Sequence, residues 1–212
     1  SAAYWLAPHG RAIVLERETQ PGYHSTGRSA AQFMESYGSL QVRRLTRASR
    51  AFFMQPPAGF APHALIHPRS SLFVATTGQE DLLREQWELL RQTSPNLQRL
   101  DAAHACALFP VLQPDKVCGA LLDPDTCDMD VDALLQGFLR GVRQAGGQIV
   151  TQAEVKQMRR EKDGLWHVQA ADRTFIAPVV VNAAGAWADE IARLAGAEPL
   201  GLEPRRRSAF TF

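Results

Sequence analysis

The stretch Ala12-Ile13-Val14-Leu15-Glu16 decides the fold. It is a short apolar run that ends in an acid, and it follows helix-forming residues 2–6, which Pro8-His9-Gly10 terminates. A short helix, a glycine and a short apolar strand are typical of the second half of a βαβ unit, in which a helix connects two parallel strands. The sequence therefore predicts an α/β fold from its beginning.

Glu16 is the first candidate binding residue. In dinucleotide-binding folds an acid at the end of the second strand accepts hydrogen bonds from the adenosine ribose, about 20 residues beyond a glycine-rich loop. Counting back from Glu16 places that loop just before Ser1, so we expect the sequence to be a piece of a longer protein. A second interpretation stays open, in which Glu16 is a solvated carboxylate at a strand end.

The composition excludes several classes of protein. The 212 residues include 23 Lys and Arg and 22 Asp and Glu, a net charge of +1 that argues against nucleic acid or an anionic membrane as partner. No apolar run approaches the ~18 residues of a membrane-spanning helix, and no signal peptide begins the sequence. Cys106, Cys118 and Cys127 lack the spacing of a disulfide framework or a zinc site. We expect a cytoplasmic protein.

Helices and strands are expected to alternate along the rest of the chain. The expected helices lie after the turn at 25–29 as far as Met34, and at 41–54, 80–91, 102–108, 131–145 and from Trp187 to near Gly196. The expected strands lie at 71–76, 148–151, 155–160, 165–170, 174–177 and 179–182, and residues 58–68 are expected to form a loop. A three-stranded meander then replaces one crossover of a mainly parallel sheet.

The second motif is His24-Ser25-Thr26-Gly27-Arg28-Ser29-Ala30-Ala31. Small hydroxyl residues and glycine at a helix start expose backbone N–H groups to an anion, and Arg28 can add charge-assisted bonds to a phosphate. An ordinary capped helix start has the same composition, so the motif alone leaves both interpretations open.

The third motif is Val179-Val180-Val181-Asn182-Ala183-Ala184-Gly185-Ala186-Trp187. A buried strand that runs into Ala-Ala-Gly leaves little side chain at its carboxyl end, where ligands bind in open α/β sheets. Tight packing of strand against helix is the alternative reason for such small residues.

Together, residues 15–18, 24–31 and 181–189 resemble the FAD-dependent amino-acid oxidoreductases of the D-amino-acid oxidase superfamily. The resemblance covers nearly the whole chain and is closest to the bacterial D-arginine dehydrogenase type, which segments 50–60 and 205–210 support. It implies an α/β, FAD-binding Rossmann-like parallel sheet with a β-meander crossover, plus part of a mixed α+β substrate domain, truncated at both ends. Residues 1–57 and 129–200 would form the FAD-binding domain, 58–128 a substrate-domain segment, and 201–212 the start of a second one.

The resemblance also implies roles for individual residues. The FAD-binding set would be Glu16 and Arg17 at the adenosine; Ser25, Thr26, Gly27, Arg28, Ser29, Ala30, Ala31 and Gln32 along the pyrophosphate toward the isoalloxazine; Val155 at the adenine; and Ala184 and Gly185. Arg206 would bind the substrate carboxylate and Tyr37 would line the substrate pocket. Ser71 stands where an acid would face a cationic side chain, and Gln32 where a histidine is expected, so both positions argue against a preference for arginine.

The activity that the resemblance implies is oxidation of D-amino acids, of basic or broad range, to imino acids by hydride transfer to flavin, in amino-acid catabolism. The electron acceptor, a quinone or another compound, is left open, and so is a peripheral position at the inner membrane. No catalytic residue is assigned, and the 212 residues alone are expected to be inactive. The alternatives are a sarcosine oxidase-like or glycerol-3-phosphate dehydrogenase-like enzyme, or a non-catalytic dinucleotide-binding module.

Three further clusters are interpreted as structural. Arg43, Arg44, Arg47 and Arg50 are expected to form a solvated basic helix face. His63 and His67 are flanked by prolines that exclude a helical metal pair. Asp123, Asp125, Asp128 and Asp130 lack the glycine and glutamate of a calcium loop, so they are interpreted as turn and cap residues.

Overall fold

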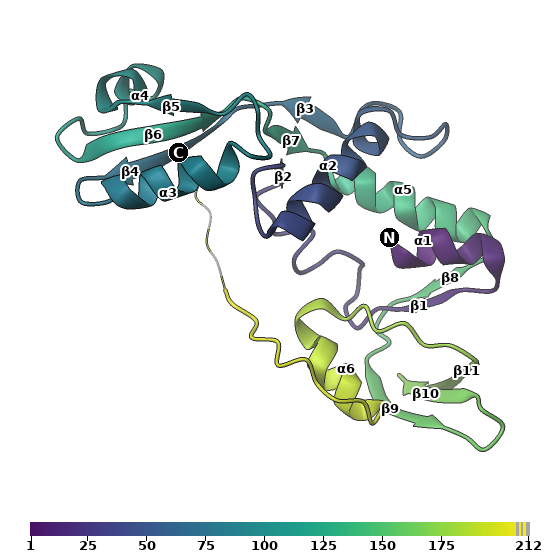
Figure 1. Cartoon of the computed structure of the whole chain (residues 1–212). Coiled ribbons are helices and arrows are strands. Elements are labelled where there is room, and N and C mark those ends of the chain that lie inside the picture. The colour runs from purple at the N-terminus through teal and green to yellow at the C-terminus, as the bar shows by residue number, and fades with distance from the viewer. Residues whose placement is uncertain (207, 209, 211–212) are drawn as a thin grey trace. The chain divides into compact units, whose positions relative to one another are not determined.

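The computed structural model describes residues 1–206, 208 and 210, and the chain divides into two compact units (Figure 1). Unit 1 comprises Ser1–Ala30 and Leu135–Phe212, and unit 2 comprises Ala31–Leu134. Residues 31–57 belong to the same compact unit as residues 58–128, and the expected division into FAD-binding and substrate-domain segments stays a prediction. Which unit binds FAD stays a prediction at this stage.

Unit 1 contains the predicted βαβ features. Strand β1 (Ile13–Leu15) pairs in parallel with β8 (Gln148–Val150), with Ile13 opposite Gln148. Helix α1 (Ala2–Leu6) and the 3-10 turn η1 (Ala7–His9) precede β1. The helix α1 packs so closely on α5 (Val131–Gln144) that a Cβ at Gly141 would lie 2.3 Å from the Tyr4 ring. The predictions for these elements are confirmed.

The predicted meander is also confirmed. Strands β9 (Val155–Arg160), β10 (Trp166–Ala170) and β11 (Arg173–Ala177) form an antiparallel sheet with β10 in the centre. After it come the 3-10 turn η2 (Gly185–Trp187) and helix α6 (Ala188–Leu194). The meander is local in sequence, so turn signals between short strands are enough to predict it.

Unit 2 contains two antiparallel sheets. In the first, β6 (Val117–Asp123) lies between β4 (Ser71–Thr76) and β5 (Gln98–Leu100). One set of its apolar side chains packs with α3 (Glu80–Leu90) and another with α4 (Ala102–Leu108). In the second, β7 (Cys127–Met129) lies between β2 (Gln32–Phe33) and β3 (Ile66–Pro68). Its core includes Phe53 of α2 (Leu40–Met54).

Several element predictions are wrong. No helix extends to Met34, because Ala31 adopts a left-handed backbone with φ of 53° and the next two residues pair with β7 instead. The expected loop at 58–68 contains β3, and β5, β6 and β7 were not expected. Only β1 and β8 pair in parallel among the described strands, so the sheet is less parallel than expected.

The expected buried strand at residues 179–182 is also wrong. Val179 is 71% exposed and Val181 is 52% exposed, and neither belongs to a strand. Strand pairing requires a partner, and no strand within the described residues pairs with this segment. The apolar side chains therefore lie on the surface of unit 1.

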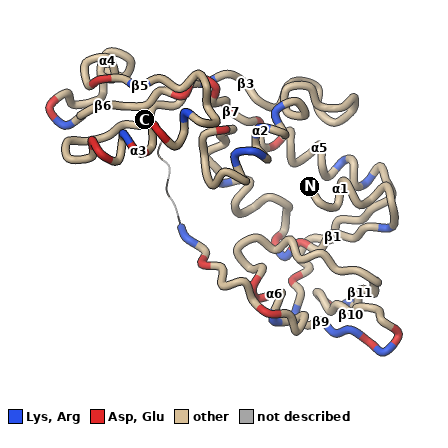
Figure 2. The backbone as a smooth tube through the Cα atoms, in the orientation of Figure 1, with Lys and Arg blue, Asp and Glu red and all other residues tan. Residues whose placement is uncertain are grey.

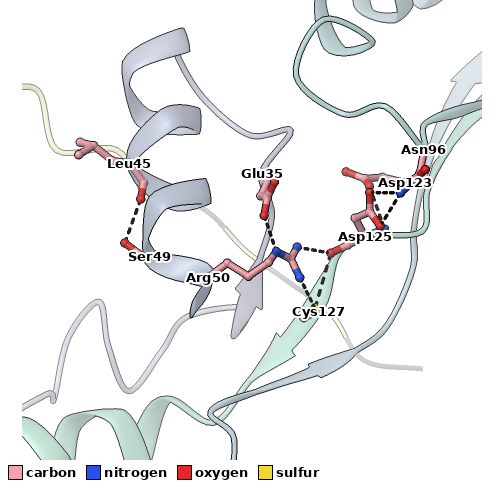
Figure 3. Close-up of polar contacts among 8 residues, drawn as sticks. All are labelled: Glu35, Leu45, Ser49, Arg50, Asn96, Asp123, Asp125 and Cys127. Carbon is pink, nitrogen blue, oxygen red and sulfur yellow. Dashed lines mark hydrogen bonds and ion pairs between the residues drawn. The ribbon is translucent and has the colours of Figure 1, made fainter. Parts of the chain in front are cut away.

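The basic face of α2 is not uniformly solvated. Arg43 is only 5% exposed, and its guanidinium donates to the Leu89 carbonyl at 3.2 Å and to the Thr93 hydroxyl at 3.0 Å. Leu89 lies in the last turn of α3, where the helix dipole favours a cation. Two apolar residues of the same helix, Val42 and Leu45, are instead 47% and 70% exposed. Arginines therefore form part of the contacts between α2 and the rest of unit 2. Arg50, which donates to the Asp125 carbonyl, is a second example (Figure 3).

Two of the four aspartates, Asp123 and Asp130, act as turn and cap residues, as predicted, whereas the Asp125 carboxylate accepts the Asn96 amide and that of Asp128 pairs with Arg69. The Asp130 carboxylate accepts the Ala133 N–H at 2.8 Å at the start of α5, and Asp123 accepts the Asp125 N–H at 3.1 Å. The longest helix of the described residues has 15 residues, and none is long and apolar enough to cross a membrane. Figure 2 shows acidic and basic positions interspersed along both units.

Candidate functional site

Glu16 lies where the parallel strand β1 ends. Its N–H donates to the Val150 carbonyl at 2.8 Å, and its Oε1 accepts the Glu18 N–H at 3.0 Å. The Glu16 carbonyl accepts the Ala153 N–H at 2.8 Å, which holds the segment leading into β9 beside the strand end. Val155 begins β9, so the two residues predicted to meet the adenosine lie on neighbouring segments.

Arg17 connects this strand end to two other segments. Its guanidinium lies 3.4 Å from the Glu18 carboxylate and 3.6 Å from that of Glu154. Its central carbon lies 5.0 Å from the centre of the Trp187 ring, a cation–π distance. Arg17 is therefore already engaged by protein groups next to the predicted adenosine site.

The second motif forms a tight turn rather than a helix start. The Gly27 N–H donates to the Gly22 carbonyl at 2.7 Å, and a Cβ at Gly27 would lie 2.6 Å from that oxygen. Only glycine permits this approach. The Arg28 N–H donates to the His24 carbonyl at 3.0 Å. The glycine of the motif is thus explained by backbone packing.

The turn offers donors that suit a phosphate group. Residues 25–30 are all exposed. The backbone N–H groups and hydroxyls of Ser25 and Thr26 donate to no other residue in the described part of the chain. Arg28 lies 4.7 Å above the Tyr23 ring and forms no ion pair with a described carboxylate. Amide donors without a protein acceptor, beside a guanidinium that forms no ion pair, fit the pyrophosphate of a dinucleotide.

The third motif forms a small-residue turn at η2. Asn182 stabilises it from both sides, because its Oδ1 accepts the Ala184 N–H at 3.3 Å and its Nδ2 donates to the Ala188 carbonyl at 2.8 Å. Gly185 has φ of 57°, and no atom lies within 4 Å of the Cβ it lacks. The open space over Gly185 would admit a ligand close to the backbone.

His24 and Trp187 bring the three motifs together. The His24 ring lies 4.7 Å from the Trp187 ring, and its Nε2 lies 2.8 Å from the Glu18 carboxylate. Trp187 therefore contacts Arg17 and His24 at once. Both residues stand inside the motifs, but no role could be predicted for their rings, because their contacts depend on segments that lie far apart along the chain.

Asp189 anchors the segment that leads to Arg206. It is 8% exposed, and its carboxylate accepts the N–H groups of Leu200 at 2.9 Å and Leu202 at 2.8 Å. Although burial raises the pKa of Asp189, these backbone hydrogen bonds outweigh it and lower the pKa below its ordinary value. Arg206 is exposed, and the neighbouring Arg207 lies outside the described residues.

The residues predicted to line the substrate pocket are divided between the units. Arg206 belongs to unit 1, whereas Gln32, Tyr37 and Ser71 belong to unit 2. Tyr37 is 53% exposed and lines, together with Phe73, an apolar hollow of about 330 Å³. The Ser71 hydroxyl is buried without a hydrogen-bond partner among the described residues. The substrate pocket that these residues would form together stays a prediction.

Comparison with known proteins identifies the family. The family model described as FAD dependent oxidoreductase matches residues 1–212. The chain therefore belongs to the FAD-dependent oxidoreductases, and FAD is its cofactor. The expected fold class is confirmed by a glycine oxidase from Geobacillus kaustophilus, whose crystal structure has a TM-score of 0.75 at 22% identity, over 91% of this chain and 54% of that one.

Two curated relatives are similar to most of the chain. Rat dimethylglycine dehydrogenase is 25% identical over 92% of this chain, and mouse sarcosine dehydrogenase is 29% identical over 88%. The chain spans 23% and 21% of the length of these two relatives. The resemblance to the D-arginine dehydrogenase type is not borne out as the specific assignment, because these two relatives are named for dimethylglycine and sarcosine and not for D-arginine. The expected cytoplasmic location stays a prediction.

Proposed function

We propose that the chain is part of a flavoenzyme that oxidises an amino acid at the carbon next to its nitrogen. The observation that carries the proposal is the meeting of the three cofactor motifs at Trp187, which Arg17 and His24 both contact. A structural module without a ligand would not need unclaimed phosphate donors at Ser25 and Thr26 beside Arg28. The membership of the family supplies the redox chemistry.

Unit 1 is proposed to hold most of the cofactor. Glu16 would accept hydrogen bonds from the ribose. The Glu18 N–H already donates to the Glu16 carboxylate and so limits the orientations that this carboxylate can adopt. The turn at residues 25–30 would bind the pyrophosphate, and Val155, Ala184 and Gly185 would approach the cofactor through their backbone. Ala31 and Gln32 extend the predicted cofactor segment into unit 2. Arg17 is proposed to support the adenosine site from the side, since its guanidinium is held by two carboxylates.

The substrate is proposed to be an α-amino acid or its N-methylated form. The names of the curated relatives, which include sarcosine and dimethylglycine, favour N-methylated substrates, and the resemblance of the sequence favours a D-amino acid. Both kinds carry a carboxylate, which Arg206 would bind as a charge-assisted pair. FAD, when bound, supplies the hydride acceptor. The oxidised product has a carbon–nitrogen double bond that water then hydrolyses.

A dye-reduction assay of the full-length, flavin-loaded protein tests the proposal. Sarcosine, dimethylglycine, glycine and D- and L-forms of alanine, proline, lysine and arginine would be compared with glycerol 3-phosphate. We expect reduction with at least one amino acid and release of an aldehyde or a keto acid in equal amount. Reduction by glycerol 3-phosphate alone would replace the amino-acid proposal, and FAD binding without any turnover would favour the non-catalytic module.

A further inference from the structure

Trp187 contacts two of the predicted cofactor segments and belongs to the third. We propose that Trp187 is a positioning residue for FAD, whose indole ring fixes Arg17 and His24 and so aligns the strand end at Glu16 and the turn at 25–30 with Gly185. The inference rests on the proposed function of unit 1. It assigns no direct contact with the cofactor to Trp187.

The contact with Arg17 acts on the adenosine end of the site. The Arg17 side chain is 40% exposed, and an exposed arginine samples many rotamers unless it is restrained. The ring at 5.0 Å and the carboxylates of Glu18 and Glu154 restrain it from three directions. Because Arg17 follows Glu16 directly, a fixed Arg17 limits the backbone conformations available to the residue that would bind the ribose.

The contact with His24 acts on the pyrophosphate end. The His24 ring packs at 4.7 Å from Trp187 and is held at 2.8 Å from Glu18. The backbone carbonyl of His24 accepts the Arg28 N–H at 3.0 Å, which closes the turn that carries the free donors. Packing of His24 against Trp187 therefore fixes the residue from which this turn begins.

The backbone of Trp187 belongs to the third segment. Its N–H donates to the Ala184 carbonyl at 3.1 Å, on either side of the left-handed Gly185. This backbone hydrogen bond attaches Trp187 to the small-residue turn, and the side chain of Asn182 stabilises the same turn. Movement of the indole relative to Arg17 or His24 would displace Gly185 from the other two segments.

The surroundings of Trp187 distinguish positioning from core packing. The three apolar clusters formed by the described residues all lie in unit 2. Trp187 is half-buried and has a guanidinium and an imidazole as neighbours. Loss of the indole should therefore weaken FAD binding more than it destabilises the apoprotein.

The test measures the Kd for FAD of full-length apoprotein by flavin fluorescence titration. One cation–π and one aromatic contact together correspond to about 10-fold in an equilibrium constant, so we expect Trp187→Leu to raise the Kd about 10-fold. Trp187→Phe keeps a ring and should raise it about 3-fold. Trp166→Leu is the matched control, because Trp166 is half-buried in β10 of the same unit, and its Kd should stay within about 2-fold of the wild type.

Thermal melting of the apoproteins and two further variants complete the test. Arg17→Met and His24→Leu should each weaken binding, and their effects should be less than additive with Trp187→Leu, because all three act through one contact set. A wild-type Kd for Trp187→Phe and Trp187→Leu, with or without a lowered melting temperature, would refute positioning and leave the proposed function intact. A wild-type protein that binds no FAD would refute the proposed function itself.

Discussion

Arg50 of α2 contacts four residues of unit 2, and its removal should destabilise that unit strongly. Its Nε pairs with the Glu35 carboxylate, its Nη2 donates to the Asp125 carbonyl at 2.8 Å, and its Nη1 lies 3.7 Å from the Cys127 sulfur (Figure 3). The guanidinium also lies 5.0 Å above the Phe33 ring. We expect Arg50→Met to break all of these contacts while the methionine keeps the apolar packing of the arginine stem.

The size of the loss follows from how much of the pair is buried. The Glu35 side chain is 14% exposed and that of Arg50 is 31% exposed. A fully buried pair costs about 3–5 kcal/mol when one partner is removed, and an exposed pair about 0–1 kcal/mol. The lost bond to the Asp125 carbonyl adds about 1 kcal/mol. For this intermediate burial we expect the free energy of unfolding of unit 2 to fall by about 2–3 kcal/mol.

The charge state of Arg50 does not limit the experiment. Although burial lowers the pKa of Arg50, the hydrogen bond and the charge of Glu35, together with Cys127, raise it above its ordinary value. Arg50 is therefore charged at every pH at which the protein is folded, and the expected loss at neutral pH comes from the substitution alone.

Urea unfolding, followed by far-UV circular dichroism, measures the change. The matched control is Arg47→Met, because Arg47 lies on the same helix, is exposed and forms no ion pair within the described residues. We expect that control to change the unfolding free energy by less than about 0.5 kcal/mol. Equal effects of Arg50→Met and Arg47→Met would refute the reasoning, and so would an Arg50→Met effect that is undiminished in a Glu35→Gln background.

Three more results are expected. Glu16→Ala should lower FAD retention after dialysis with an unchanged circular dichroism spectrum, and unchanged flavin content would contradict the ribose assignment. Asp130→Ala should cost about 1 kcal/mol of stability at pH 7 by loss of the α5 cap. Because the N–H of Ala133 and the ring of His63 lower the pKa of Asp130 in the folded state, this contribution is present above the ordinary carboxyl pKa and is lost as the pH falls through the lowered value, so melting curves of the two proteins should converge in acid. Arg206→Met should reduce kcat/KM for every amino-acid substrate by about 30-fold or more, with Arg205→Met as the control.

Elements with a strong local signal were predictable from the sequence. The apolar residues of 131–145 recur with helical spacing after an N-cap aspartate, and the structure has α5 at Val131–Gln144. The meander has turn residues between each pair of strands, and all three strands form. In these cases the contacts that stabilise the element lie within a few residues, so the pattern is sufficient.

Elements that depend on distant partners were not predictable. Gln32 pairs with Asp128 and Phe33 with Cys127, across most of unit 2, and a two-residue strand has no periodicity of its own. Residues 179–182 show the opposite case, because a β-branched run stays outside any strand when no described strand pairs with it. The prediction that Arg43 is solvated was wrong for the same reason, because its hydrogen-bond acceptors lie on and after α3, far from its own helix in the sequence.

The candidate site was predictable as motifs but not as a set of contacts. Residue types alone indicated candidate cofactor positions at the acid Glu16, at Gly27 and at the small residues Ala184 and Gly185. The contacts among the motifs pass through His24 and Trp187, and their distances depend on how three segments fold together. An aromatic residue that directly follows a small-residue turn is the one signal that pointed toward such a contact.

The distribution of the predicted residues explains why the family is clear while the substrate is not. Most predicted cofactor residues lie in unit 1. Several of them are proposed to act through their backbone or through a small side chain, a role that would tolerate much change elsewhere in the sequence. The two departures from the D-arginine dehydrogenase pattern, Gln32 and Ser71, both lie in unit 2. Substrate preference depends on such side chains, because a single buried polar group can reject or accept a substrate that lacks its partner. The predicted cofactor site is therefore expected to persist at low sequence identity while the substrate side chains change.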